Sequence, residues 1–181
     1  DLQGRPMKRV WRSVAALACC LPLLASASEL DGLLDSLADS CQASPALVSL
    51  LKSLGHAEGE PRQVVQPAQL SVPPALAASF GAPERVAVND DIWLLGVPAQ
   101  ASWHGVPVTA LTRLLSLHEA GGEFAIELNG RPAEVEAGLR KALSFRHSKV
   151  AVGDSWQTRG ASFVVGVNGE TSTALVCPLP F

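Results

Sequence analysis

The sequence has no tyrosine, few aromatic residues and little charge. Its 181 residues include 5% aromatic and 17% charged residues, with a formal net charge of -3. The absence of Tyr excludes a Tyr-rich recognition surface and a Tyr nucleophile. The low charge excludes a polyelectrolyte tail and disfavours a basic protein that binds nucleic acid. At 48% hydrophobic residues the chain is too apolar to be disordered throughout, and its length allows one domain.

Motifs for catalysis, phosphate binding and metal binding are also missing. There is no Gly-x-x-x-x-Gly-Lys-Ser/Thr or Gly-x-Gly-x-x-Gly loop, no Gly-x-Ser-x-Gly, no His-Glu-x-x-His and no Cys-x-x-Cys. The 4 histidines are scattered, so a zinc site would need ligands from distant positions. We therefore expect no cofactor and no metal, and a protein that is not an enzyme.

The first residues have the pattern of a secretory signal peptide. Lys8, Arg9 and Arg12 are followed by an apolar run over residues 14–24 and then by small residues. This order predicts a signal peptide over residues 7–27, cleaved after Ala27, with residues 1–6 as read-through or added sequence. The apolar run is too short to span a bilayer. Lipid attachment at Cys19 or Cys20 is a second interpretation, with less fitting neighbours around each cysteine.

The remaining body contains two cysteines, Cys41 and Cys177, and is acidic. It has 10 basic and 16 acidic residues, which gives a net charge of -6. In an oxidising compartment two cysteines predict one disulfide, while two free thiols are the alternative. The predicted location is periplasmic or secreted.

The N-terminal part of the body is predicted to be an αα-hairpin over residues 28–55. Leucines and Cys41 recur at helical spacing over residues 29–41. The second helix has Ser44 as its N-cap, Pro45 in the first turn, a leucine stripe, and Gly55 as its end. Residues 56–67 are polar and rich in helix breakers, so we interpret them as a linker or an exposed loop.

The rest of the body, residues 56–181, is predicted to be mostly β and to form a single domain with the helical hairpin. Strand pairs are expected at 85–88 with 92–97 and at 161–167 with 171–177, the latter around Asn168-Gly169. Residues 108–117 fit strand or helix spacing, residues 123–128 fit a strand, and a helix begins near Pro132. The predicted class is α+β: the αα-hairpin packs on a mainly antiparallel sheet with one inserted helix and a C-terminal β-hairpin.

A group of tryptophan, histidine and arginine residues is the candidate binding site. Trp and Arg are enriched at the energetic centres of protein interfaces because they gain contact area at low entropic cost. The alternative is that the tryptophans fill the core. The candidate residues are Trp93, Trp103, His104, Arg113, His118, Trp156 and Arg159.

Three functions are compatible with these features. The first is an exported binding protein that acts on another protein, as an inhibitor, immunity factor or envelope accessory protein, without nucleic-acid contact and without a stable membrane anchor. The second is a small-molecule or lipid carrier, which predicts a pocket of several hundred Å³ lined by Leu, Val and Trp. The third is a small envelope enzyme in which His104, Arg113 and His118 converge in a cleft.

Overall fold

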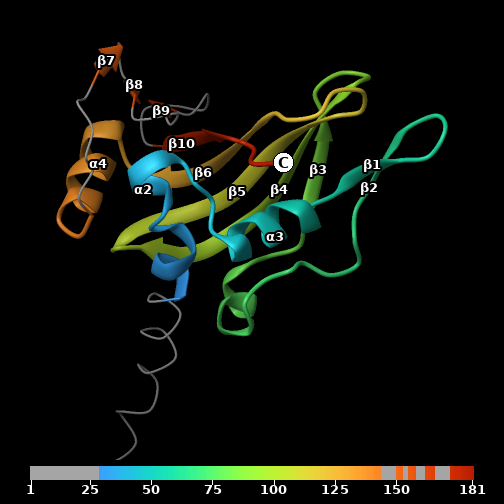
Figure 1. Ribbon diagram of the computed structural model, residues 1–181. Coiled ribbons are helices and arrows are strands. Elements are labelled where there is room, and N and C mark those ends of the chain that lie inside the picture. Colours follow the sequence, from blue (N-terminus) through green and yellow to red (C-terminus); the bar gives the residue numbers. More distant parts are fainter. Residues whose placement is uncertain (1–28, 144–149, 153–154, 158–161, 166–171) are drawn as a thin grey trace, which may run out of the picture.

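An eight-stranded antiparallel sheet forms the body of the molecule. The computed structural model describes residues 29–143, 150–152, 155–157, 162–165 and 172–181. The strand order is β3-β4-β5-β6-β10-β9-β8-β7 (Figure 1). Their bounds are β3 (Glu84–Ala87), β4 (Ile92–Trp103), β5 (Val106–Ser116), β6 (Glu123–Asn129), β7 (Val150–Val152), β8 (Ser155–Gln157), β9 (Ser162–Val165) and β10 (Ser172–Pro178). With its helices, this sheet confirms the predicted α+β class.

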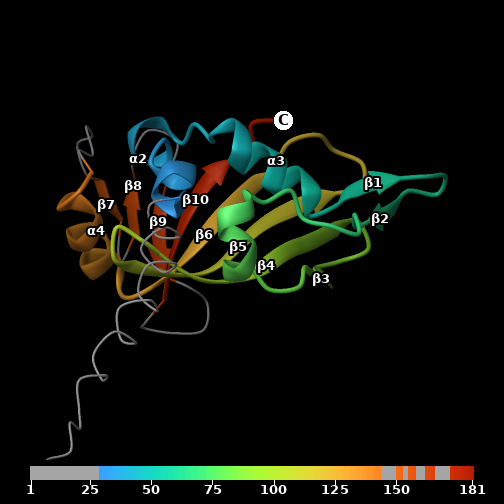
Figure 2. The same cartoon turned by 90° about the horizontal axis from the view of Figure 1, so that it is seen from below.

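Helices from the N-terminal part cover one face of the sheet, as the αα-hairpin prediction requires. Residues 29–34 are helical, and α2 (Leu37–Ser40) and α3 (Pro45–Ser53) follow. Figures 1 and 2 show α2 and α3 over the strands β4, β5 and β6. Their leucines form one buried cluster with inward side chains of the sheet, which removes apolar surface from water. Members of the cluster include Leu30, Leu34, Leu47, Leu51, Leu95, Leu111 and Ile126.

The first predicted helix is divided at Asp35 and Ser36, which form a turn. The Asp35 carboxylate accepts a hydrogen bond from Trp103, the last residue of β4 and 68 residues later in the sequence. Helical spacing of the leucines could not show this long-range contact. The second helix begins as predicted, because Ser44 Oγ accepts a hydrogen bond from the Leu47 N–H at 3.2 Å and Pro45 occupies the first turn.

The segment predicted as a linker contains a small hairpin. Strand β1 (His56–Glu58) pairs antiparallel with β2 (Gln63–Val65), and the Val64 side chain is buried. Each of these strands has only three residues, which is too short for an alternating pattern to be recognised in the sequence. After this hairpin the chain forms the 3₁₀ helix η1 (Pro74–Ser79).

The predicted strand pairs of the sheet are present. Strand β3 pairs with β4, and β9 pairs with β10; the turn predicted at Asn168-Gly169 lies outside the described residues. The ambiguous segment 108–117 belongs to β5, which alternates buried and exposed side chains. The helix predicted near Pro132 is α4 (Pro132–Arg140), with Val135 and Leu139 buried.

The predicted disulfide is confirmed. Cys41 directly follows α2 and Cys177 lies in β10, with their Cα atoms 5.6 Å apart at a sequence separation of 136. The bridge fastens the helical layer to the middle of the sheet. Among the described residues, no helix has the length and apolar character needed to cross a bilayer.

Candidate functional site

Trp103 and His104 hold the turn between β4 and β5 against the N-terminal helix. Trp103 is fully buried, and its Nε1 donates a hydrogen bond to Asp35 Oδ1 at 2.9 Å. The His104 backbone N–H donates to Asp31 Oδ1 at 2.8 Å. The His104 ring lies between the two carboxylates, with Nε2 2.8 Å from Asp35 Oδ1 and Nδ1 3.5 Å from Asp31 Oδ2. These contacts join the N-terminal helical segment to the turn between β4 and β5. We call the group of Asp31, Asp35, Trp103 and His104 the clamp, and its role is structural.

The backbone at His104 is part of the clamp. Its φ angle is +44°, a left-handed conformation that residues other than Gly adopt rarely. The ring and backbone contacts to Asp31 and Asp35 together hold that conformation. Within the residues that the structure describes, no group of three or more His, Cys, Asp or Glu side chains is arranged to hold a metal ion.

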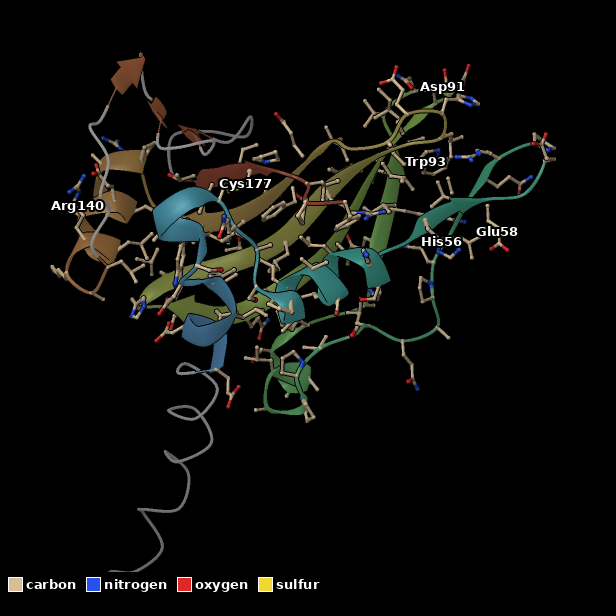
Figure 3. The ribbon with its side chains drawn as sticks, in the orientation of Figure 1. His56, Glu58, Asp91, Trp93, Arg140 and Cys177 are labelled. Atoms are coloured by element: carbon tan, nitrogen blue, oxygen red, sulfur yellow. A yellow bond between two sulfur atoms is a disulfide. The ribbon has the colours of Figure 1, made fainter. Side chains whose placement is uncertain are left out.

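His118 and Trp93 lie at the opposite end of the β4–β5 pair from His104. His118 follows β5, and its Nε2 is 3.2 Å from Asp91 Oδ1, just before β4. Figure 3 shows Asp91 and Trp93 at this end of the molecule. Trp93 stacks on Arg85, with the guanidinium carbon 5.7 Å from the ring centroid. The structure therefore does not bring His104 and His118 to a common cleft.

Two candidate residues lie outside the side chains that the structure describes. Trp156 belongs to β8, but its side chain is not described, and Arg159 is in the segment 158–161. Their part in any binding site stays a prediction.

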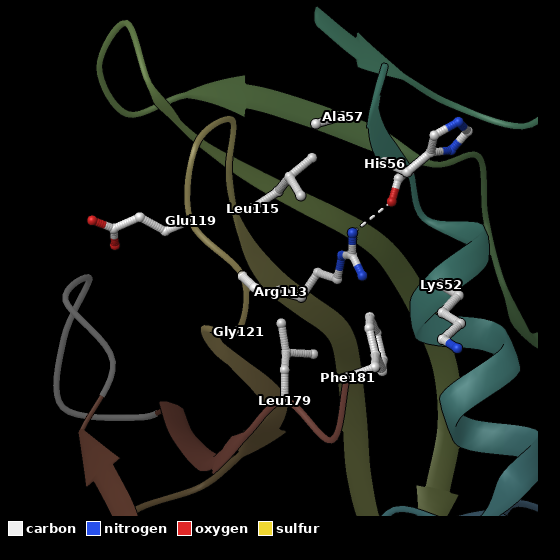
Figure 4. Close-up of a pocket in the computed structure, with 11 residues that line it drawn as sticks. Lys52, His56, Ala57, Arg113, Leu115, Glu119, Gly121, Leu179 and Phe181 are labelled. Atoms are coloured by element: carbon white, nitrogen blue, oxygen red, sulfur yellow. Dashed lines mark hydrogen bonds between the residues drawn. The ribbon is translucent and has the colours of Figure 1, made fainter. Parts of the chain in front are cut away.

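Arg113 lines a cavity between the helical layer, the β1–β2 hairpin and the C-terminal segment (Figure 4). The cavity has a volume of about 440 Å³. Leucine lines it, as expected for a carrier, but the valine and tryptophan that were also expected are not among its lining residues. Its lining residues are Lys52, Gly55, His56, Ala57, Arg113, Leu115, Glu119, Ala120, Gly121, Leu179 and Phe181.

Strand alternation places the Arg113 guanidinium on the covered face of the sheet. Leu111 and Arg113 point to the same side of β5, and only 4% of the Arg113 surface is exposed. One Nη2 hydrogen is donated to the Gly55 carbonyl oxygen, whereas Nε is buried without a hydrogen-bond partner. The Phe181 ring covers the guanidinium, with its centroid 5.3 Å from Cζ.

The charge of Arg113 has no acidic counterpart in the described part of the chain. No carboxylate of the described residues lies within ion-pair distance of its nitrogens, and burial lowers the pKa of Arg113 below its usual value. Lys52 adds a second cation at the rim, where its Nζ is 4.9 Å from the Phe181 ring centroid. Glu119 also lines the cavity, but its carboxylate is turned away from Arg113 (Figure 4). Arg113 is therefore the buried charge of the cavity; Lys52, His56 and Glu119 line it with exposed side chains, and the other lining residues are glycine or apolar.

Most of the cavity residues were not candidates from the sequence. Lys52 and Gly55 come from the end of α3, and Leu179 and Phe181 follow β10, more than a hundred residues later. One sequence signal was present: Arg113 stands between Leu111 and Leu115 at the inward positions of a strand. An arginine at such a position is unusual, since charged residues rarely occupy buried sites without a partner.

Comparison of the chain with protein-family models, with curated proteins and with solved structures gave no significant match.

Proposed function

We propose that this chain is a small exported binding protein whose cavity takes a small anionic ligand at Arg113. The observation that carries the proposal is the burial of Arg113 beside a cavity of about 440 Å³: only 4% of the residue is exposed, its Nε hydrogen has no acceptor, and it has no acidic partner among the described residues. Its volume is in the range of about 300–1,000 Å³ that small-molecule sites occupy.

The energetics of burial explain why an anion fits this site. Moving a charged group out of water without a counter-ion costs several kcal/mol even after the protein relaxes. The Gly55 carbonyl and the Phe181 ring offset a part of this cost for Arg113. A bound anion would supply the missing opposite charge. It would relieve part of the desolvation cost of Arg113, and the free energy so recovered would contribute to the affinity for the ligand.

A thermal-shift and calorimetric titration with small anions tests this function. The panel contains carboxylates, phosphates and sulfates that bear short apolar groups. We expect at least one of them to raise the unfolding temperature, because a ligand at 100 times its Kd stabilises the native state by about 2.7 kcal/mol. Arg113→Met should abolish that effect.

Arg85→Met is the matched control. Arg85 lies on β3, which β4 separates from the Arg113 strand β5; it donates to the Val64 carbonyl oxygen at 2.9 Å and does not line the cavity. Its variant should bind the anion as the natural chain does. Absence of any response to the whole panel, or equal loss in both variants, would overturn the proposed ligand site.

Export is the second part of the proposal and is tested separately. It is supported by the leader-like pattern of residues 7–27 and by the disulfide, which persists in oxidising compartments. Mass spectrometry of the protein from its natural source should find a chain that begins at Ser28 and lacks two hydrogens because Cys41 and Cys177 are bridged. A product that retains residues 7–27 and has both thiols reduced would contradict this part.

A protein partner is the second candidate function, favoured by an exposed apolar row on the uncovered face of the sheet. Val86 lies opposite Leu94, and Leu94 lies opposite Leu114, in neighbouring strands. Their exposed fractions are 59%, 36% and 36%. Contiguous apolar surface of this kind is typical of protein interaction sites.

Charged substitutions on the two faces of the molecule test this candidate. The bait is the bridged chain, incubated with an extract of the compartment to which the protein is exported. Val86→Glu should abolish recovery of a stoichiometric partner, while Val65→Glu, at an exposed valine of β2, should not. Equal recovery with both variants would show that the apolar row is not the contact surface.

A further inference from the structure

We infer that the ligand of this cavity is a monocarboxylate with an apolar body, held with its carboxylate group in the plane of the Arg113 guanidinium. This inference rests on the proposed function and adds the chemical class of the ligand. It follows from how the guanidinium is already occupied, from the charges around the cavity, and from the lining of its walls.

The Phe181 ring covers one face of the Arg113 guanidinium, and the buried Nε–H has no acceptor among the described residues. The centroid of the ring lies 5.3 Å from Cζ, and Gly55 accepts a hydrogen bond from Nη2. A planar carboxylate that lies in the guanidinium plane accepts from two adjacent N–H groups, which is the two-pronged geometry that arginine favours.

The charges around the cavity favour one negative charge over two. A single carboxylate matches the charge of Arg113, which is the buried cation of this site. A phosphate monoester would bring a second negative charge and a third oxygen into the cavity. Lys52 and Glu119 both line the cavity with exposed side chains, whose charges water screens, so neither of them balances that second charge.

Beyond the guanidinium the walls are apolar. Leu115, Leu179, Ala57 and Ala120 line the cavity together with the Phe181 ring. A volume of about 440 Å³ corresponds to roughly 15 water volumes in the liquid. That is room for a carboxylate with an aliphatic chain of about six to eight carbons. Binding would transfer the methylene groups of this chain from water to the apolar walls, which is favourable.

Calorimetric titration of the disulfide-bonded chain with four probes tests the class of ligand. The probes are octanoate, octyl phosphate, octanol and acetate. We expect octanoate to bind at least ten times more tightly than the other three, because only octanoate combines a planar single charge with an apolar chain. Arg113→Lys should weaken octanoate binding at least tenfold, since an ammonium group cannot form the two-pronged contact. Arg85→Lys, the matched control, should bind octanoate as the natural chain does.

The possible results separate this inference from the proposed function. If octyl phosphate binds as tightly as octanoate, or more tightly, and Arg113→Met abolishes that binding, the carboxylate class is wrong although the anion site stands. If Arg113→Lys binds octanoate as well as the natural chain, the in-plane contact is wrong. If octanol binds as octanoate does, charge does not select the ligand. If none of the small anions binds, the proposed function itself fails. Circular dichroism of each variant confirms that it is folded before titration.

Discussion

Removal of the Cys41–Cys177 bridge should cost a large part of the stability of this protein. The bridge closes a loop of 136 residues, and both cysteines are buried. In the chain-entropy treatment a loop of this length restricts the unfolded chain by about 5 kcal/mol. Domains of this size have a total stability of about 5–15 kcal/mol, so the variant Cys41→Ala/Cys177→Ala should be marginally stable.

Urea unfolding followed by tryptophan fluorescence measures this loss, because Trp103 is buried in the native state. The free energy of unfolding of the double variant is compared with that of the oxidised natural chain and of the same chain after reduction. Each single variant is the control and should match the double variant, since either substitution opens the loop. A loss below about 1 kcal/mol would refute the entropic reasoning and would show that packing alone holds the helical layer on the sheet.

Three further substitutions test separate contacts by urea unfolding. Trp103→Phe removes the donor to Asp35 and leaves a small cavity, so we expect a loss of about 3 kcal/mol; no loss would show that the clamp is not stabilising. Gly138→Ala should destabilise α4 despite a gain in helix propensity of about 1 kcal/mol, because the new Cβ would lie 2.8 Å from Val106 Cγ2. In a chain that already carries Val106→Ala, the same substitution should instead be stabilising by that gain. If the effects of the two substitutions on the free energy of unfolding simply add, there is no clash between them. Arg113→Met should leave stability unchanged or raise it by about 1 kcal/mol, because it removes an unpaired buried charge; a loss above about 2 kcal/mol would show that the contact with Gly55 dominates.

Several parts of the fold were predictable because their signals are local. Ser44, Pro45 and the leucine stripe define α3 without any distant contact. Strand pairs such as β3 with β4 follow from β-prone runs around a short turn. The disulfide followed from the number of cysteines left in the body and not from geometry.

Other parts depend on contacts between distant residues and could not be predicted from spacing. At the break in the first helix the Asp35 carboxylate accepts a hydrogen bond from Trp103, 68 residues later. The cavity needs the end of α3, the middle of β5 and the segment after β10 to meet. Arg113 was a candidate because arginine is common at interfaces, whereas the structure shows that its burial without a counter-ion is the informative property.

The edge of the sheet at β3 limits how this protein can aggregate. Strand β3 has only four residues, and beyond it the neighbouring strand β4 contains Pro98, which has no N–H to donate. Near that point the free side of β4 is already covered in part, because Phe80 forms an isolated bridge with Ala99 and the Gly81 N–H donates a hydrogen bond to the Pro98 carbonyl oxygen. A second chain that added itself to this edge would find a short, interrupted template, which is unfavourable for the continuous stacking that cross-β fibrils require. At high concentration we therefore expect reversible association through the apolar sheet face before fibril growth from this edge.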